Sequence, residues 1–287
     1  MVISIAHLGP QGTNAETAAL AYAQWLEKQT GQLTQLSPCP TIARSLYAVA
    51  HEEVDLGVVP VENSTEGSVA ITLDTFWEFD QLQIQQELVL PIIHTLFSCA
   101  ATLEEIKTVY SHPQALAQCQ KWLEKSLPRV QLVATSSTTE ALKYVNLEPT
   151  TAAIASPRAA KLYNLPIIAD EINDYPDNCT RFWVVGRSPT TNGSHSALAF
   201  SVPKNEPGAL VKALQIFADR GINLSRIESR PTKRSLGEYL FFVDLENSIS
   251  DDSTQAALAQ LANCTEIIKI FGSYRILKIE SSMIANL

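Results

Sequence analysis

Apolar and polar positions alternate along the N-terminal part of the chain in a way that predicts strands separated by helices. The apolar run Val2–Leu8 is typical of a strand, and Thr13 with Glu16 forms a capping box that opens a helix over about 14–28. The next expected elements are a capped helix from Thr41, a strand at Asp55–Val61, and a helix, capped by Asn63 or Ser64, that runs to about Phe79. This alternation predicts a parallel, doubly wound sheet.

A second lobe is predicted after the extended segment Gln83–Phe97, which is broken at Pro91 and which we interpret as a crossing between lobes. Strand and helix patterns then resume up to Ala169, and the chain returns through Asp174–Thr180 to an apolar strand, Arg181–Val185. The elements expected in between are a short helix capped by Thr102, strands at Lys107–Tyr110, Val130–Val133, Ala152–Ala155 and Ile167–Ala169, and helices that open at Ser111–Gln114, Ser137 and Ser156–Pro157.

Two α/β lobes joined by crossing strands are typical of a cleft protein with the two-lobed fold of the type II periplasmic binding proteins. We expect this domain over 1–187, with lobe one at about 1–80 plus 172–187 and lobe two at about 92–170. Ligands of such folds bind between the lobes, where strands end and helices begin.

The C-terminal part predicts a separate small domain over 196–275. The segment Arg187–Ser196 is polar, contains Pro and Gly, and is typical of a linker. Beyond it, the hydrophobic pattern fits a ferredoxin-like βαββαβ unit. Its expected elements are Ala197–Val202, Gly208–Arg220, Leu224–Ser229, Tyr239–Leu245, Asp252–Leu261 and Ile267–Ile270. We therefore expect that truncation after about Ser188 leaves a folded and active remainder.

Composition narrows the class of protein without identifying a reaction. The chain has 287 residues, of which 46% are hydrophobic and 18% charged, as in a well-packed globular protein. Its formal net charge of −9 and the lack of a basic run argue against nucleic-acid or acidic-membrane partners. No apolar stretch approaches the roughly 20 residues of a membrane helix, and the N-terminus has no charged leader, so we expect a cytoplasmic protein. Five cysteines without CxxC spacing and five scattered histidines argue against a metal site.

Polar side chains gather where the return segment enters its strand. Asn178, Thr180 and Arg181 lie immediately before the apolar run Phe182–Val185, and Pro176, which precedes them, is typical of a turn. Polar groups at the mouth of a buried strand are where open α/β proteins bind their ligands. The alternative is that these side chains only tie off a loop, and composition does not decide between the two interpretations.

Four predicted helix starts share a second feature, because each places small hydroxyl or amide side chains beside free backbone N–H groups. They are Gly12–Thr13, Asn63–Ser64, Ser111–Gln114 and Thr135–Ser137. Four such starts in one cleft would suit a small dicarboxylate or phosphate, whereas each alone is ordinary helix capping. The chain has no Ser-His-Asp order, Walker loop or GxGxxG pattern, so nucleotide chemistry is not expected.

Several motifs together resemble the prephenate dehydratase family. In chain order they are GPQGTNAETAA (9–19), PVENSTEGSV (60–69), SHPQALAQC (111–119), AAIASPRAA (152–160) and DNCTRFWV (177–184). In addition, PGALV (207–211) and ESRP (228–231) resemble the regulatory ACT domain of that family. The resemblance spans almost the whole chain. One departure is Asn14–Ala15, where the family usually has phenylalanine followed by serine or threonine.

The resemblance implies a carbon–oxygen lyase that converts prephenate to phenylpyruvate, water and CO2 in phenylalanine biosynthesis, with no metal or organic cofactor. It makes Thr180 the essential residue, and we expect Asn178 to position the Thr180 hydroxyl, which is too weak an acid to act outside a hydrogen-bond network. We expect Arg181 to contact a substrate carboxylate, the alternative being a structural salt bridge. His112 either caps its helix or transfers protons. Further expected substrate contacts are Thr13, Asn63, Ser64, Gln114, Ser137 and Phe182.

The same resemblance implies that phenylalanine binds the ACT domain and inhibits the enzyme. The expected binding residues are Gly208, Ala209, Leu210, Val211, Glu228, Ser229, Arg230 and Pro231. Pairing of ACT domains implies a homo-dimer or homo-tetramer, and the alternative is a domain that only dimerises. Two other functions stay open at this point. One is arogenate dehydratase, and the other is a non-catalytic amino-acid sensor built from the same cleft and ACT domain.

Overall fold

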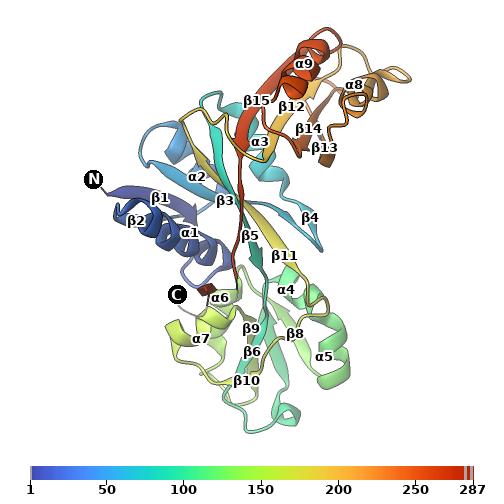
Figure 1. Cartoon of the computed structure of the whole chain (residues 1–287). Coiled ribbons are helices and arrows are strands. Elements are labelled where there is room, and N and C mark those ends of the chain that lie inside the picture. Colours follow the sequence, from blue (N-terminus) through green and yellow to red (C-terminus); the bar gives the residue numbers. More distant parts are fainter. Residues whose placement is uncertain (1, 281–282, 285–286) are drawn as a thin grey trace.

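The computed structural model describes residues 2–280, 283–284 and 287 and contains three β-sheets, which follow one another from top to bottom in Figure 1. The middle sheet belongs to the first lobe and has the strand order β16-β5-β11-β3-β1-β2, with β4 paired to β3. These strands are β1 (Ile3–Leu8), β2 (Thr34–Cys39), β3 (Leu56–Asn63), β4 (Gly67–Ser68), β5 (Gln83–Pro91), β11 (Cys179–Gly186) and β16 (Ile276–Lys278). β1, β2 and β3 are parallel, as predicted, whereas β11 runs antiparallel between β3 and β5.

Three helices pack on this sheet, and two of them begin where the capping pattern predicts. Thr13 caps α1 (Asn14–Thr30) by accepting the Glu16 N–H at 3.4 Å, and Thr41 caps α2 (Ile42–Ala50). The third helix, α3 (Ala70–Glu78), begins later than predicted. The prediction that Asn63 or Ser64 caps this helix is wrong, because β3 continues through Asn63 and folds back into β4 before the helix begins.

The second lobe contains a five-stranded sheet of order β10-β6-β9-β7-β8. β5 leads the chain toward this lobe and β11 leads it back, so the two paired strands join the lobes (Figure 1). The strands are β6 (Thr95–Ser98), β7 (Thr108–Ser111), β8 (Gln131–Ala134), β9 (Thr151–Ala155) and β10 (Ile167–Ala169). The helices are η1 (Leu103–Glu105), α4 (Pro113–Gln118), α5 (Gln120–Ser126), α6 (Thr138–Ala141), η2 (Leu142–Tyr144) and α7 (Pro157–Tyr163). The two-lobed α/β fold is therefore confirmed.

The third sheet forms the C-terminal domain and has the antiparallel order β13-β14-β12-β15. Its elements are β12 (His195–Ser201), α8 (Ala209–Ala218), β13 (Leu224–Pro231), β14 (Tyr239–Leu245), α9 (Asp252–Leu261) and β15 (Ile267–Tyr274). One face of the sheet packs on α8 and α9, where Phe200, Phe217 and Leu261 are fully buried. The predicted ferredoxin-like βαββαβ pattern is confirmed.

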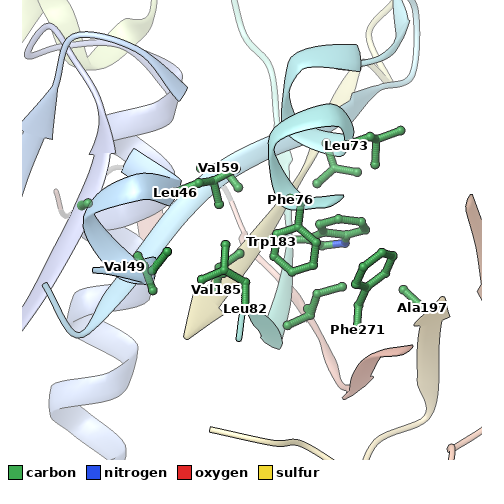
Figure 2. Close-up of a cluster of buried hydrophobic side chains, with 14 of the residues drawn as sticks. Leu46, Val49, Val59, Leu73, Phe76, Leu82, Trp183, Val185, Ala197 and Phe271 are labelled. Carbon is green, nitrogen blue, oxygen red and sulfur yellow. The ribbon is translucent and has the colours of Figure 1, made fainter. Parts of the chain in front are cut away.

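The other face of this sheet packs against the first lobe instead of solvent. Figure 2 shows Phe271 and Ala197 of the C-terminal domain beside Phe76 of α3 and Trp183 of β11. The Phe76 ring centroid lies 5.4 Å from that of Trp183 and 5.0 Å from that of Phe271. Each large side chain fully buried in such a contact contributes about 1.5–3 kcal/mol, so the two domains share one hydrophobic core.

The end of the chain also ties the two domains together, which the sequence pattern does not predict. After β15 the chain runs down along the first lobe (Figure 1), where β16 pairs in parallel with β5. Beyond it, Met283, Ile284 and Leu287 pack beside the core that α1 covers. Truncation after about Ser188 would remove β16 and uncover the core around Trp183, so the structure argues against a stable, active remainder.

Candidate active site

A cavity of about 770 Å³ lies between the two lobes and is lined by residues of both. The first lobe contributes the ends of β1 and β3, the start of α1 and part of β11, and the second lobe contributes the starts of α4 and α6. The structure therefore brings together six of the predicted residues, namely Thr13, Asn63, Gln114, Ser137, Thr180 and Phe182. Three other predicted residues, Ser64, Asn178 and Arg181, do not line this cavity.

Thr180 and Asn63 lie directly opposite each other on β11 and β3. The Asn63 Nδ2 amide donates to the Thr180 hydroxyl oxygen at 2.9 Å, and both residues are less than a tenth exposed. Within the part of the chain that the structure describes, the Thr180 hydroxyl has no acceptor of its own. Its oxygen therefore accepts a hydrogen bond from the protein, and its proton is available to a ligand in the cavity.

The orientation of the Asn63 amide is fixed by the turn that follows β3. Its Oδ1 accepts the backbone N–H of Thr65 at 3.1 Å, the Thr65 hydroxyl at 2.6 Å and the backbone N–H of Glu66 at 3.1 Å. Because only an oxygen can accept three such donors, the Nδ2 group must face Thr180 and Asn178. The sequence pattern predicted a helix start here, whereas the segment forms a turn, and this turn directs the Asn63 amide group toward Thr180.

Asn178 supports the Asn63–Thr180 pair from outside the cavity. Its Oδ1 accepts from Asn63 Nδ2 at 2.9 Å and from the Ser64 hydroxyl at 3.2 Å, and its Nδ2 donates to Gln118 Oε1 at 3.0 Å. Gln118 in turn donates to the Thr65 hydroxyl at 3.1 Å. Asn178 and Ser64 thus hold the site residues in place rather than lining the cavity, which corrects the expectation that Ser64 contacts the substrate.

Gln118 and His94 are site residues that the sequence analysis missed, and both line the cavity. His94 Nε2 lies 2.8 Å from Gln118 Oε1, so Nε2 carries the proton of the neutral ring and Nδ1 is left as an acceptor. The Nδ1 atom is buried and has no hydrogen-bond partner among the described residues. Burial lowers the pKa of His94, and the hydrogen bond with Gln118 only partly opposes this. One signal was available for Gln118, which lies one helical turn after Gln114 in the SHPQALAQC motif.

The helix starts that line the cavity use their own hydroxyl or ring groups as caps. The Thr13 hydroxyl donates to the Pro10 carbonyl at 2.9 Å, Ser137 accepts the Glu140 N–H at 3.0 Å, and His112 Nδ1 accepts the Gln114 N–H at 3.3 Å. His112 is therefore a helix cap, one of the two roles expected for it. The predicted gathering of helix starts in one cleft holds for α1, α4 and α6. Asn63 lines the same cavity, but it ends β3 and does not begin a helix.

Charge is sparse in the cavity. Among the described residues that line it, Lys143 is the only lysine or arginine, and Glu140 is the only carboxylate. The side chain of Glu140 accepts the backbone N–H of Ser136 at 2.9 Å and also the Ser136 hydroxyl, and these hydrogen bonds lower its pKa. Asn14 and Ala15, the residues that depart from the family motif, also line the cavity, so an amide lies where the family usually has a phenyl ring.

Arg181 does not face the cavity, and the expectation that it contacts a substrate carboxylate is wrong. Alternate side chains of a strand point to opposite faces, so Arg181 lies on the reverse side from Thr180 and Phe182. There it forms ion pairs with Glu62 at 2.7 Å, Glu87 at 2.6 Å and Asp244 at 2.7 Å. The alternative role, a structural salt bridge, fits this arrangement.

A smaller cavity of about 300 Å³ lies in the C-terminal domain. Gly208, Ala209, Leu210, Val211 and Ser229 line it, together with Tyr239, Phe241 and three others. The remaining predicted residues, Glu228, Arg230 and Pro231, do not line it. Glu228 accepts the Ser68 hydroxyl at 3.0 Å and Arg230 binds Asp74 at 2.9 Å, because these alternate positions of β13 face the first lobe.

The described residues contain no group of three or more His, Cys, Asp or Glu side chains that could hold a metal ion. No helix among them has the length and apolar character needed to cross a membrane.

Comparisons with known proteins agree with the two domains seen in the fold. Residues 5–190 match the family model described as prephenate dehydratase, and residues 196–263 match the model described as ACT domain. A bifunctional chorismate mutase/prephenate dehydratase of Aquifex aeolicus is 42% identical over 274 residues, which are 95% of this chain and 73% of that protein. A prephenate dehydratase of Methanocaldococcus jannaschii is 38% identical over 274 residues, which are 92% of this chain and 95% of that protein.

A solved structure shares the whole architecture. The prephenate dehydratase of Arthrobacter aurescens, solved in complex with L-Phe, superposes with a TM-score of 0.82 at 35% sequence identity. The superposition covers 96% of this chain and 90% of that chain, and so includes both lobes and the C-terminal domain.

Proposed function

The chain belongs to the prephenate dehydratase family of carbon–oxygen lyases, and from this premise we propose that Thr180 donates the proton with which prephenate loses water. In the family's reaction the ring C4–O bond breaks and the hydroxyl leaves as water after taking up one proton. The ring carboxylate leaves as CO2, and the electron pair of its C–C bond enters the ring. The ring becomes aromatic, which supplies the driving force, so the protein needs mainly a proton donor and correct orientation.

The observation that carries this proposal is the 2.9 Å hydrogen bond from Asn63 Nδ2 to the Thr180 hydroxyl oxygen. Because the oxygen accepts this hydrogen bond, the hydroxyl proton stays free for a ligand in the cavity, and the Asn63 amide stabilises the negative charge that develops on the oxygen as this proton departs. A threonine hydroxyl is a weak acid, so its proton moves together with C–O cleavage and is replaced afterwards from water. Asn178, Gln118 and His94 hold Asn63 in this orientation.

The distribution of charge supports a substrate orientation. The pyruvyl carboxylate of prephenate keeps its charge through the reaction, and Lys143 is the cation in the cavity that could bind it. The ring carboxylate loses its charge as CO2, which suits the uncharged part of the cavity around Ile92, Val69 and Phe182. Lys143→Met should raise KM for prephenate by about 2–5-fold with little change in kcat, as expected for one exposed ion pair.

Arogenate dehydratase is the alternative enzyme function. Arogenate carries an ammonium group where prephenate carries a keto group, and the Lys143 ammonium would repel it, which favours prephenate as the substrate. Initial rates on the two substrates, measured side by side with the purified chain, test this choice. A higher kcat/KM on arogenate would overturn it, and no turnover of either would leave the amino-acid sensor as the function.

We place the effector in the smaller cavity of the ACT domain. The related Arthrobacter enzyme was solved in complex with L-Phe, and here the backbone N–H groups at the start of α8 lie beside Gly208, where an amino-acid carboxylate can bind. Calorimetry with L-phenylalanine, compared between the wild type and Gly208→Val, tests the site. Unchanged affinity in the variant would contradict it.

The exposed apolar surface of the ACT domain favours pairing with a second copy of the chain. Val211, which lines the effector cavity, is 64% exposed, Ile227 of β13 is 46% exposed, and β13 is an edge strand of its sheet. A second ACT domain would cover these apolar groups, giving the proposed homo-dimer or homo-tetramer. Sedimentation equilibrium would show a single monomeric species if this assembly is wrong. As a biosynthetic enzyme like its relatives, the protein is expected to act in the cytoplasm.

A further inference from the structure

The two strands that carry the active-site pair present a second, charged pair on their reverse face. Thr180 is paired with Asn63 across β11 and β3, and the next position pairs Arg181 with Glu62. Adjacent side chains of a strand point to opposite faces, so each dipeptide places one side chain toward the cavity and the other away from it. The register between β11 and β3 shifts just beyond this point, between Arg181 and Phe182. The charged pair therefore lies next to the point at which the register between β11 and β3 changes.

Arg181 is the centre of a back-face cluster, which we define as Glu62, Glu87, Arg181, Arg226 and Asp244. Its guanidinium binds Glu87 through two nitrogens at 3.0 and 2.6 Å, Glu62 at 2.7 Å and Asp244 at 2.7 Å. Although burial by itself opposes the charge, the hydrogen bonds to Glu87 and the charge of Asp244 raise the pKa of Arg181 above its usual value. The side chain thus stays charged and is held on three sides.

One of the three carboxylates comes from the ACT domain. Asp244 lies on β14 and its side chain is only 1% exposed, although it reaches a strand of the catalytic domain. Arg226, on the neighbouring strand β13, lies 3.9 Å from Asp244 and 3.6 Å from Glu62. None of these groups lines the cavity. The ACT domain therefore contacts the dipeptide that carries Thr180 from the side opposite the cavity.

We propose that Asp244 is a positioning residue for the dehydration: through Arg181 it fixes the strand register that holds the Thr180 hydroxyl against Asn63. This inference rests on the proposed role of Thr180. The catalytic domain supplies the reacting groups, and the ACT domain supplies a fixed anchor for one of their two strands. A bidentate guanidinium with a third carboxylate has little rotational freedom, which limits sliding of β11 past β3.

The test compares Asp244→Asn with Asp74→Asn in the full-length chain. Asp74 forms the matched control, because it binds Arg230 of the ACT domain at 2.9 Å but lies on α3 and forms no ion pair with a residue of β3 or β11 among the described residues. For Asp244→Asn we expect kcat to fall by roughly 10–100-fold with KM changed much less, since small misplacements of reacting groups can cost on the order of 100-fold. We expect Asp74→Asn to keep wild-type kcat.

Hydrogen exchange provides a readout that a general loss of stability would not reproduce. In Asp244→Asn the amides of residues 61–63 and 179–182 should exchange faster, while in Asp74→Asn they should exchange at wild-type rates. Asp244→Asn changes the cluster from three carboxylates and two cations to two of each, so the substitution leaves no excess charge in it. If this variant does not fold, Asp244→Glu against Asp74→Glu decides the question, with a lower kcat expected for Asp244→Glu alone.

A wild-type kcat in folded Asp244→Asn, or equal losses in the Asp244 and Asp74 variants, would overturn the inference. Failure of the proposed function is recognised separately, because it requires that Thr180→Val keeps its activity. An inactive Thr180→Val with a fully active Asp244→Asn contradicts the positioning role alone. An active Thr180→Val with a slow Asp244→Asn contradicts the role of Thr180.

Discussion

The two faces of the β3–β11 pair differ completely in chemistry although adjacent residues build them. The cavity face carries Asn63 and Thr180, which have no formal charge, and the reverse face carries Glu62 and Arg181, whose cluster has three carboxylates and two guanidinium groups. A net negative cluster facing the cavity would repel a dicarboxylate substrate. Placed on the reverse face, the same charges can stiffen the strands. Neutral groups are thus left to orient the proton donor.

The largest effect should come from removing the donor on the cavity face. Thr180→Val keeps the shape of the side chain and loses the hydroxyl, so we expect kcat to fall by about 10³-fold, within the range of general acid catalysis. Thr180→Ser is the matched control because it keeps the hydroxyl. Steady-state formation of phenylpyruvate measures both variants, and similar rates for the two would remove Thr180 from the reaction.

Breaking the reverse face should mainly reduce stability. Arg181→Met leaves the buried carboxylate of Glu87 without its guanidinium partner and that of Asp244 with only the more distant Arg226. Loss of one partner of a buried ion pair costs about 3–5 kcal/mol. Urea unfolding measures this change in the free energy of unfolding. The control is Arg44→Met, which breaks a partly exposed ion pair with Glu53 and should cost much less, because surface ion pairs contribute little to stability. Equal decreases in the free energy of unfolding of the two variants would show that the buried cluster stabilises the fold no more than a surface ion pair does.

A smaller effect should follow from reversing one hydrogen bond on the cavity face. Asn63→Asp keeps Oδ1 and replaces the Nδ2 donor with a second acceptor, so the Thr180 proton would bond to the protein instead of the substrate. We expect kcat to fall by about 10²-fold. Asn263→Asp, at an exposed position, serves as the control for the added charge. A wild-type kcat in Asn63→Asp would contradict the orientation argument.

The smallest effect concerns pH. Burial lowers the pKa of His94 below 6.5, so the folded protein holds this ring neutral while the unfolded chain protonates it near pH 6.5. The unfolded state then binds more protons, and stability should fall as pH decreases below about 6.5. His94→Gln can still donate to Gln118 but cannot titrate, so its stability should fall less.

Urea unfolding at about pH 7.5 and about pH 5.5 gives this pH dependence for each variant. The control is His51→Gln, which replaces an exposed histidine and should follow the wild type. Burial also lowers the pKa of His7, so the stability of His94→Gln should still depend on pH to some extent. An unchanged loss of stability in His94→Gln would contradict the assignment.

The sequence predicts much of the fold because local signals mark the start of most helices. Thr13, Thr41 and Ser137 cap the helices that they were expected to cap, and Pro113 opens α4. The segment after β3 was misjudged because Asn63 caps a turn with the same hydrogen bonds that could begin a helix. The C-terminal strand β16 is only three residues long, and its partner β5 is far away in the sequence.

Site residues could be predicted from the sequence where they belong to a motif. Their orientation and partners could not be predicted where these depend on strands that are distant in the sequence. Thr180 and Asn63 came from motifs, and the structure places them in contact. The direction of Arg181 could have been inferred from strand alternation relative to Thr180. Its partners could not, because Glu62, Glu87 and Asp244 lie on three other strands, the last in a different domain.

The central claim is that Thr180 transfers its proton in the chemical step, and a single-turnover experiment tests it most directly. Enzyme in excess over prephenate, mixed rapidly in H2O and in D2O, gives the rate of phenylpyruvate formation without product release. We predict a slower chemical step in D2O for the wild type and for Thr180→Ser, and a very slow step in Thr180→Val. Equal rates in H2O and D2O for the wild type would contradict proton donation by this hydroxyl.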